Sequence, residues 1–265
     1  MELGIENKRV LVTGASQGIG REISIAFARE GCKVSVISRN RKRLINLLDE
    51  MNDLSRGSKN NQKLHSYYPI DLMLPGAPTE AIKELTYNNN FDIVIHNLGG
   101  TLNVKDPLAA SHEWEKVWRF NVGIAIEMNK MLIPAMQKKK WGRIIHISSI
   151  SAESVRGSSP YAAAKAYLNA YVKGIGRSFA KEGIIITALM PGAVYAEGGH
   201  WDEKSKINAN NKEAFFKKRA DFLRHHHAIG RLGNAEEIAP FALFMASDLV
   251  TFAAASIIPV DGGTM

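Results

Sequence analysis

Residues 9–31 read RVLVTGASQGIGREISIAFAREG, and this stretch indicates the fold. The short apolar run RVLVT is typical of a buried strand, whereas the apolar positions of IGREISIAFAREG recur at helical spacing. TGASQGIG (13–20) joins the two segments and is rich in glycine. Glycine permits a tight turn and lets backbone N–H groups approach a pyrophosphate at the start of a helix. We therefore expect a nucleotide-binding loop here, with a purely structural turn as the alternative.

The same alternation of strand and helix continues along the chain. Apolar runs predict strands at 9–14, 33–38, 91–97, 142–148, 183–190 and 255–260, all buried on both faces, and a weaker strand at 63–69. Helical patterns fall at 19–31, 43–54, 81–89, about 112–138 and 161–182. This rhythm predicts an α/β fold, a three-layer doubly wound parallel sheet of the Rossmann type, in a single domain over residues 1–265.

One segment, 193–231, interrupts the rhythm. It is polar and its composition favours helix. Its aromatic side chains, which we expect to pack or to face substrate, are Trp201, Phe215, Phe216 and Phe222. Near its end stand three consecutive histidines, His225 to His227. The segment follows the carboxyl end of a strand, where open α/β sheets bind ligands. We expect a helical substrate lid, with a decorative excursion as the alternative. Consecutive histidines point in different directions, so no metal site is expected.

Composition limits the cellular setting and the partners. The chain has 265 residues, a net charge of +8 and a single cysteine, Cys32, which cannot form an internal disulfide. With no apolar leader and no apolar run near 20 residues, we expect a cytoplasmic protein without a membrane segment. The basic residues gather in RNRKR (39–43), KKK (138–140) and KKRADFLR (217–224), on separate elements. Nucleic-acid binding is therefore not expected, and KKK is expected to be solvated surface.

The end of the second strand favours one nicotinamide cofactor over another. An NAD site usually has a carboxylate there for the ribose hydroxyls, but this strand ends in Ser38 and Arg39, and no acid follows until Asp49. A guanidinium can bind a 2′-phosphate through two hydrogen bonds, and the serine hydroxyl can add a third. We therefore predict NADP(H) rather than NAD(H) as the cofactor.

A tyrosine and a lysine stand four residues apart in SSPYAAAKAY (158–167). The alanines between them favour helix, Ser158 or Ser159 can cap it and Pro160 suits its first turn, so Tyr161 and Lys165 should share one helix face. An ordinary surface pair would look the same.

Taken with other motifs in order, this pair makes the chain resemble the short-chain dehydrogenase/reductase family over nearly its whole length. The matching pieces are TGASQGIG at 13, Asp71-Leu72, HNLGG at 96, Asn121, Ser148 in IHISS, YAAAK, Pro191-Gly192 and a terminal VDGG at 260–263. Ser148 stands thirteen residues before Tyr161, as the catalytic serine of the family does. Its closest resemblance within the family is to 3-oxoacyl-acyl-carrier-protein reductases.

The resemblance implies two sets of site residues. The catalytic set is Asn121, Ser148, Tyr161 and Lys165. The cofactor-binding set is Gly14, Ser16, Gln17, Gly18, Ile19, Gly20, Ser38, Arg39, Asp71, Leu72, Asn97, Gly99, Tyr161, Lys165, Pro191, Gly192 and Val194. Asp71 would contact the adenine, and Asn97 and Gly99 would line the central cleft. The chain departs from the family where His96 and Leu98 replace an asparagine and an alanine, and where Ala196 replaces a cofactor-contacting threonine.

Carbonyl reduction needs a hydride donor for carbon and a proton donor for oxygen. Tyr161 suits the second role, and an ammonium one turn away, together with the positive charge of the oxidised nicotinamide, should lower its pKa from about 10. Ser148 would hold the substrate oxygen, and Asn121 would fix a water that links Lys165 to solvent.

Three functions stay open at this stage. The first is an NADP(H)-dependent reductase of a 3-oxoacyl thioester; the second is the same chemistry on a polar metabolite, such as a sugar or sugar nucleotide of surface-glycan synthesis. The third is a regulator that binds NADP(H) without turnover. An acyl carrier protein would meet Lys140 and Glu182 at the family's two basic docking positions, and the second reverses the charge, which disfavours an acidic partner. The family implies a homo-oligomer, tetramer or dimer.

Overall fold

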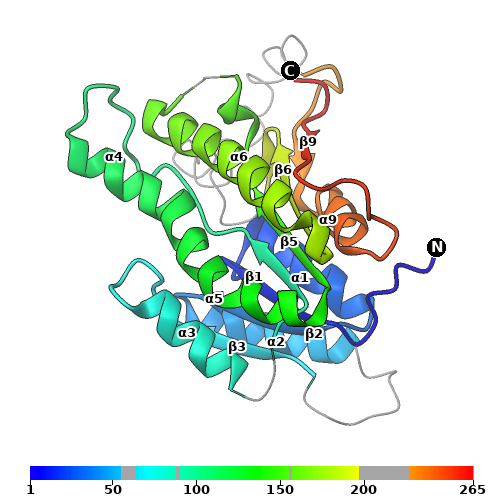
Figure 1. The fold of residues 1–265 in the computed structure, drawn as a ribbon. Coiled ribbons are helices and arrows are strands. Elements are labelled where there is room, and N and C mark those ends of the chain that lie inside the picture. Colours follow the sequence, from blue (N-terminus) through cyan, green and yellow to red (C-terminus); the bar gives the residue numbers. More distant parts are fainter. Residues whose placement is uncertain (55–63, 88–89, 155–156, 197–226, 265) are drawn as a thin grey trace.

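The computed structural model describes residues 1–54, 64–87, 90–154, 157–196 and 227–264. In these ranges a seven-stranded sheet has the order β3–β2–β1–β4–β5–β6–β9, and every neighbouring pair is parallel (Figure 1). The order confirms the predicted doubly wound α/β fold, because the chain first builds outward from β1 in one direction and then in the other. Nearly the whole predicted lid, residues 197–226 with its aromatic residues, His225 and His226, lies outside the described residues.

The strands lie close to their predicted positions: β1 (Arg9–Thr13), β2 (Lys33–Ser38), β3 (Ser66–Pro69), β4 (Ile93–His96), β5 (Gly142–Ile147), β6 (Ile184–Pro191) and β9 (Ile257–Val260). β5 and β6 are buried at every residue, as interior strands of a parallel sheet should be. β9 is only partly buried, so the prediction that this run is buried on both faces is wrong. Its position at the edge of the sheet is the physical reason.

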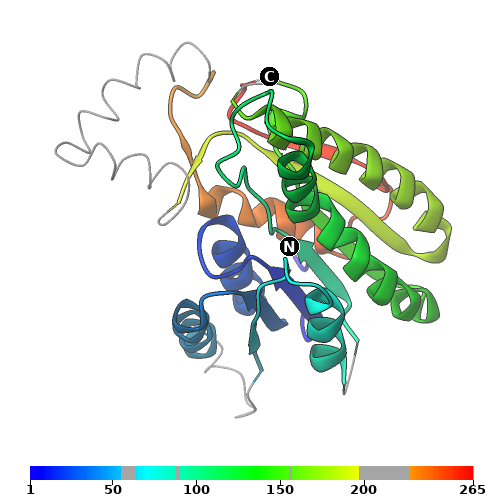
Figure 2. The same ribbon diagram turned by 90° about the vertical axis from the view of Figure 1, so that its left-hand side faces the viewer.

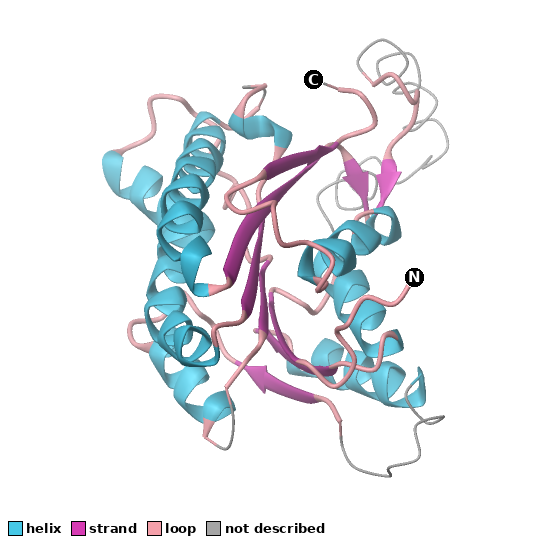
Figure 3. Cartoon of the chain, turned by 45° about the vertical axis from the view of Figure 1, so that its right-hand side comes forward, coloured by secondary structure: helices cyan, strands magenta, loops and turns pink. Residues whose placement is uncertain are grey.

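Helices cover both faces of the sheet (Figures 2 and 3). One face carries α1 (Gly18–Arg29), α2 (Arg41–Leu54) and α9 (Ala239–Ala246), and the other carries α3 (Ala77–Thr86), α4 (Ser111–Trp118), α5 (Ile124–Lys139) and α6 (Ser159–Phe179). Alternation along each strand supplies both interfaces: Val10 and Val12 of β1 belong to the core under α1, and Leu11 belongs to the core on the opposite face.

The long helix predicted near residues 112–138 has an internal irregularity. α4 and α5 are joined without a break by a π-helical turn, Arg119–Gly123, which contains Asn121. Elsewhere in the described ranges, single turns of 3-10 helix lie at Ile150–Ala152, Ala180–Glu182 and Ala235–Glu237. A π-turn inserted in an α-helix commonly marks a functional position, because it displaces side chains and frees backbone groups from the regular ladder.

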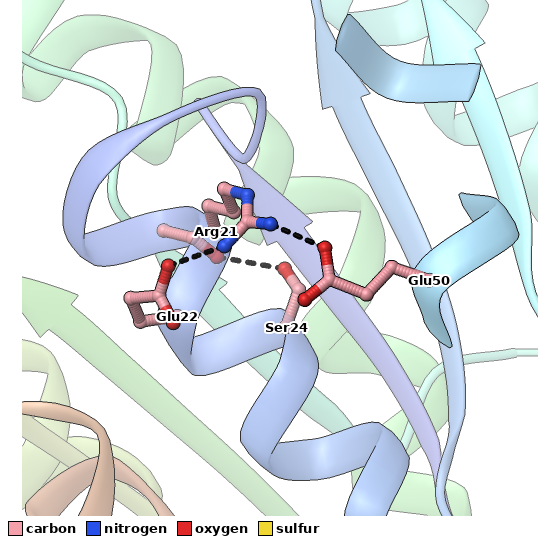
Figure 4. A network of polar contacts seen from close by, with 5 residues as sticks. Arg21, Glu22, Ser24 and Glu50 are labelled. Atoms are coloured by element: carbon pink, nitrogen blue, oxygen red, sulfur yellow. Dashed lines mark hydrogen bonds and ion pairs between the residues drawn. The ribbon is translucent and has the colours of Figure 1, made fainter. Parts of the chain in front are cut away.

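Polar contacts fasten α1 to α2. The guanidinium of Arg21 pairs with Glu50 of α2 and lies 2.6 Å from Glu22, while Ser24 Oγ donates to the Gly20 carbonyl at 2.7 Å (Figure 4). Half-exposed ion pairs contribute little to stability. Their main effect is to position α2 relative to α1, so that the basic first turn of α2 lies beside the loop that precedes α1.

A membrane span finds no support in the described ranges, where every helix is too short or too polar to cross a bilayer. A small second ladder joins β7 (Val194–Tyr195) to β8 (Gly233–Asn234), so the two ends of the interrupting segment meet beside the carboxyl end of β6. The prediction of one domain over residues 1–265 stays a prediction.

Candidate active site

The phosphate loop lies between β1 and α1, and its glycines are required by geometry. Gly14 and Gly18 have φ of +65° and +63°, a region that other residues adopt only with strain. A Cβ on Gly20 would lie 2.4 Å from Asn97 Nδ2 and 2.7 Å from the Gly14 carbonyl oxygen. The N-cap of α1, Gln17, makes no side-chain cap hydrogen bond, so the first N–H groups of the helix are left for a ligand such as a pyrophosphate.

Asn97 holds this loop from the next strand. Its Nδ2 donates to the Gly14 carbonyl at 3.0 Å and to the Thr13 carbonyl at 3.3 Å, and its backbone N–H donates to Thr13 Oγ1 at 3.1 Å. The residue therefore joins the carboxyl ends of β1 and β4, the point where the strand order reverses and open α/β sheets bind ligands. The loop fits a dinucleotide, because its glycines let the backbone approach the site closely.

The carboxyl end of β2 carries the residues predicted to bind a 2′-phosphate. Ser38 Oγ donates to Ser16 Oγ at 2.7 Å, and Arg39 Nη1 lies 3.8 Å from Asp71 Oδ2. The Arg39 side chain is 72% exposed, so its guanidinium is accessible to a ligand. Asp71 also accepts from the Met73 N–H, which fixes its loop. Leu72 is buried and Ile19 is partly buried beside the same end of the sheet.

A second guanidinium at this end was not in the predicted set. Arg43, in the first turn of α2, hydrogen-bonds Gln17 Oε1 of the phosphate loop, and its backbone N–H donates to the capping Asn40 Oδ1 at 3.0 Å. The sequence RNRKR (39–43) contained the signal for this residue. Asn40 suits a helix N-cap, and Arg43, three residues later, lies in the first helical turn on the side of the phosphate loop.

Tyr161 and Lys165 lie at the start of α6. Ser158 caps this helix by accepting from the Tyr161 N–H at 3.3 Å, and its hydroxyl donates to the Val104 carbonyl at 2.6 Å. Lys165 is 3% exposed, its Nζ lies 5.6 Å from the centre of the Tyr161 ring, and it donates to the Ile147 carbonyl at 2.7 Å. The two predicted groups therefore share one helix face, directed at the carboxyl end of β5.

Burial affects both titrating groups of this pair. It lowers the pKa of Lys165 to about 7, because the ammonium loses solvation. It also raises the pKa of Tyr161, and a hydrogen bond with the Ser149 side chain opposes that rise. Among the chain's own groups, desolvation of the phenol is the larger effect on its pKa, and the lowering expected from Lys165 together with the oxidised nicotinamide stays a prediction.

The two adjacent serines after β5 have different partners. Ser148 is buried, and its hydroxyl donates to Asn169 Oδ1 of α6 at 2.6 Å. Ser149 Oγ accepts from the Ser151 N–H at 3.1 Å, and this is the serine whose side chain lies beside the Tyr161 phenol and opposes the rise of its pKa. Ser148 follows the alternation of β5 toward α6, whereas Ser149 caps the 3-10 turn at the strand end. The hydroxyl beside the phenol is therefore one residue later than the spacing of thirteen predicted.

Asn121 is buried in the π-turn, and its amide is engaged by backbone. Nδ2 donates to the Gly100 and Val117 carbonyls, both at 2.8 Å, and Oδ1 accepts from the Gly100 N–H at 3.0 Å. The side chain thus fastens the loop after β4. A Cβ on Gly99 would lie 2.6 Å from Asn121 Oδ1 and 3.1 Å from Lys165 Nζ, so glycine lets the loop approach these groups. The water that Asn121 would fix stays a prediction.

The remaining predicted cofactor residues follow β6. Pro191 is buried at the strand end, the Gly192 N–H donates to the Val260 carbonyl at 3.1 Å, and Val194 lies in β7. A Cβ on Gly192 would lie 2.7 Å from the Asp261 Cα. These residues therefore border the site on the side opposite β2.

Two histidines form a buried polar cluster beneath the site. His96 Nε2 hydrogen-bonds Asn129 Oδ1 at 2.8 Å, and its ring stacks on that of His146 with centroids 4.7 Å apart. Asn129 Nδ2 also donates to the Tyr171 hydroxyl at 3.1 Å. Burial lowers the pKa of His96 to about 4, so this ring is neutral near neutral pH. Both strand histidines are therefore buried in the core and lie within hydrogen-bonding distance of Asn129.

Of the predicted histidine run, only His227 is in a described range. It is buried, and its Nδ1 hydrogen-bonds Thr264 Oγ1 at 2.6 Å. Across the described residues, no three His, Cys, Asp or Glu side chains are grouped to hold a metal ion.

Comparisons with known proteins agree with this arrangement. A family model described as short chain dehydrogenase matches residues 8–205. The 3-oxoacyl-acyl-carrier-protein reductase of Salmonella typhimurium is 30% identical over 267 residues, covering 98% of each chain. L-sorbose reductase from Gluconobacter frateurii, in complex with NADPH and L-sorbose, has a TM-score of 0.89 and 26% identity, covering 100% of this chain and 98% of its own. A 7α-hydroxysteroid dehydrogenase complexed with NADH has a TM-score of 0.85 and 25% identity, covering 100% and 96%.

Proposed function

The chain belongs to the short-chain dehydrogenase family, whose members act on CH–OH and C=O groups, and we propose that it is an NADP(H)-dependent oxidoreductase that interconverts a carbonyl and a secondary alcohol. The observation that carries this proposal is the placement of a buried ammonium, Lys165, beside a phenol, Tyr161, which is hydrogen-bonded to a serine hydroxyl. Such a charge is costly to bury. Its position beside a phenol supports proton transfer in addition to cofactor binding.

Two features support NADP(H) over NAD(H). Arg39 and Arg43 both lie at the adenosine end of the loop, next to the hydroxyls of Ser16 and Ser38. Two guanidiniums and two hydroxyls suit a phosphate dianion better than ribose hydroxyls, which pair with a carboxylate. Asp71 is the carboxylate nearest to Arg39 in the described region, and it would neutralise that guanidinium in part while leaving it accessible. Among similar proteins, the L-sorbose reductase structure contains NADPH.

The chain's own residues account for the proton half of the reaction. The bound nicotinamide would supply or accept the hydride at the carbonyl carbon. Tyr161 would donate its hydroxyl proton to the carbonyl oxygen, and the developing phenolate would be stabilised by Lys165. We assign to Ser149 the oxygen-holding role that the sequence predicted for Ser148. Its lone pair is engaged by the Ser151 N–H, which leaves its hydrogen to donate, whereas the hydrogen of Ser148 is donated to Asn169.

Two substrate classes have support. A 3-oxoacyl thioester is favoured by full-length similarity to 3-oxoacyl-acyl-carrier-protein reductases. A polar metabolite such as a keto-sugar is favoured by the similarity to L-sorbose reductase. The carrier-protein form of the first class is disfavoured by Glu182, whose carboxylate accepts from Gln137 Nε2 at 2.6 Å and would repel an acidic partner. We therefore propose a small thioester or polar ketone as substrate.

Assembly into a homodimer or homotetramer is part of the proposal. α9 is apolar on all sides and leaves Phe241 and Phe244 more than 40% exposed, and Phe252 is fully exposed nearby in sequence. The edge strand β9 lies next to β6 with its other side unpaired among the described strands. Large exposed apolar side chains and an unpaired edge strand support an interface between copies of the chain.

The proposal is tested by NADPH oxidation at 340 nm with small ketones, 3-oxoacyl thioesters and keto-sugars. We expect turnover with at least one class and a loss of about 100-fold or more in Tyr161→Phe, in keeping with the removal of a general acid. Binding of NADPH with no turnover across the panel would indicate the regulator instead.

A further inference from the structure

The strand end before Ser149 is held from α6 by two side chains. Lys165 Nζ donates to the Ile147 carbonyl at 2.7 Å, and Asn169 Oδ1 accepts from the Ser148 hydroxyl at 2.6 Å. Lys165 and Asn169 stand one and two helical turns after Tyr161, on the same buried face. The residues that precede Ser149 are thus fixed by the helix that also carries Tyr161.

The Asn169 amide has little other use. Its Nδ2 donates to Met190 Sδ at 3.1 Å, and a thioether is a weak acceptor. Asn169 is 8% exposed, and asparagine is costly to bury unless it is hydrogen-bonded. An apolar side chain would fill the same position on α6 at lower cost if packing were its only role. The bond with Ser148 is therefore the contact that accounts for an asparagine here.

We propose that Asn169 is a positioning residue that acts through Ser148 to fix the Ser149 hydroxyl against Tyr161. The inference rests on the proposed function for its catalytic consequence, but the placement of the Ser149 hydroxyl can be measured without turnover. Ser148 continues the backbone ladder of β5, since its N–H donates to the Leu189 carbonyl at 2.7 Å. Because both the backbone and the side chain of Ser148 are hydrogen-bonded, the next residue, Ser149, has little conformational freedom. Catalytic geometry is sensitive to shifts of about 1 Å.

The test compares Ser148→Ala, Asn169→Leu, the double variant and Ser149→Ala, with Ser178→Ala as a control that removes an exposed α6 hydroxyl bonded only within its helix. Circular dichroism checks folding. We expect kcat to fall about 100-fold or more in Ser149→Ala and about 10-fold in Ser148→Ala and Asn169→Leu, with KM for NADPH unchanged. The double variant should be no slower than the slower single variant, because both remove one contact.

A second readout does not depend on turnover. 3-Fluorotyrosine placed at position 161 reports the phenol titration by fluorine NMR in the full-length protein. Because the Ser149 hydrogen bond lowers the pKa of Tyr161, its titration midpoint should rise in Ser149→Ala and move the same way in Ser148→Ala and Asn169→Leu. If Asn169→Leu keeps both the wild-type kcat and the wild-type midpoint, the inference is overturned. It is equally overturned if Ser148→Ala abolishes turnover while Ser149→Ala does not. A wild-type protein that reduces no carbonyl but shows these midpoint shifts would refute the proposed function and leave the inference standing.

Discussion

Replacing His96 by asparagine should make the protein more resistant to acid unfolding. In the fold the His96 ring is buried, which lowers its pKa to about 4, and the hydrogen bond to Asn129 only partly opposes this. In the unfolded chain the ordinary value of 6.5 applies. Between these values the unfolded state binds more protons than the native state, so stability falls as the pH falls from about 6.5 toward 4.

The magnitude follows from the two pKa values. Lowering the pH from 7.5 to 5.0 charges most unfolded His96 but little of the native residue, which lowers the free energy of unfolding by about 2 kcal/mol. The variant lacks this loss. His146, stacked on His96, is present in both proteins and its pKa is also lowered by burial, so its contribution largely cancels in the comparison.

The assay is urea unfolding followed by circular dichroism at both pH values, for wild type, His96→Asn and the exposed-site control His112→Asn. Between pH 7.5 and 5.0, wild type and the control should lose about 2 kcal/mol more than His96→Asn does. Equal losses in all three proteins would refute the reasoning, because they would mean that His96 is protonated in the native state as readily as in the unfolded chain.

Two further predictions concern the cofactor end and the catalytic end of the site. Arg39→Ala should weaken NADPH binding about 10- to 100-fold, as expected for the loss of a hydrogen bond to a charged group, and should change NADH binding little. Isothermal titration calorimetry measures both affinities, with Lys42→Ala as the control. Equal losses of NADPH and NADH affinity would refute a contact between Arg39 and the 2′-phosphate. Gly99→Ala should lower kcat at least 10-fold, because the new methyl group would lie 2.6 Å from Asn121 Oδ1 and 3.1 Å from Lys165 Nζ. The control Gly174→Ala, whose Cβ would meet nothing within 4 Å, should leave kcat unchanged. A fully active Gly99→Ala enzyme would contradict the assigned geometry.

Much of the fold could be predicted from the sequence because strand runs and helical periodicity are local signals. RVLVT and GRIIHI gave strands close to their true bounds, since buried parallel strands are apolar throughout. The exposure of β9 was missed because this edge strand is as apolar as an interior strand, so its composition does not show which side is uncovered. The π-turn around Asn121 was missed because five residues are too few for apolar spacing to distinguish a π-helical turn from an ordinary turn of α-helix.

The site was predictable in its members more than in its contacts. Tyr161 and Lys165 share a face because helical spacing requires it. Ser148 was predicted from a count of thirteen residues, whereas the direction of each hydroxyl depends on where β5 ends and the 3-10 turn begins. Asn169 could not be singled out, because its partner is distant in sequence.

Transfer of deuterium from cofactor to product tests the central claim most directly. NADPH labelled with deuterium at C4 of the nicotinamide is incubated with the protein and the best ketone from the panel, and the alcohol is analysed by mass spectrometry. We predict one deuterium on the carbinol carbon for one of the two C4 labels, with product formed about 100-fold or more slowly by Tyr161→Phe at matched protein concentration. An alcohol without deuterium from either label, or full product formation by Tyr161→Phe, would contradict hydride transfer assisted by this phenol.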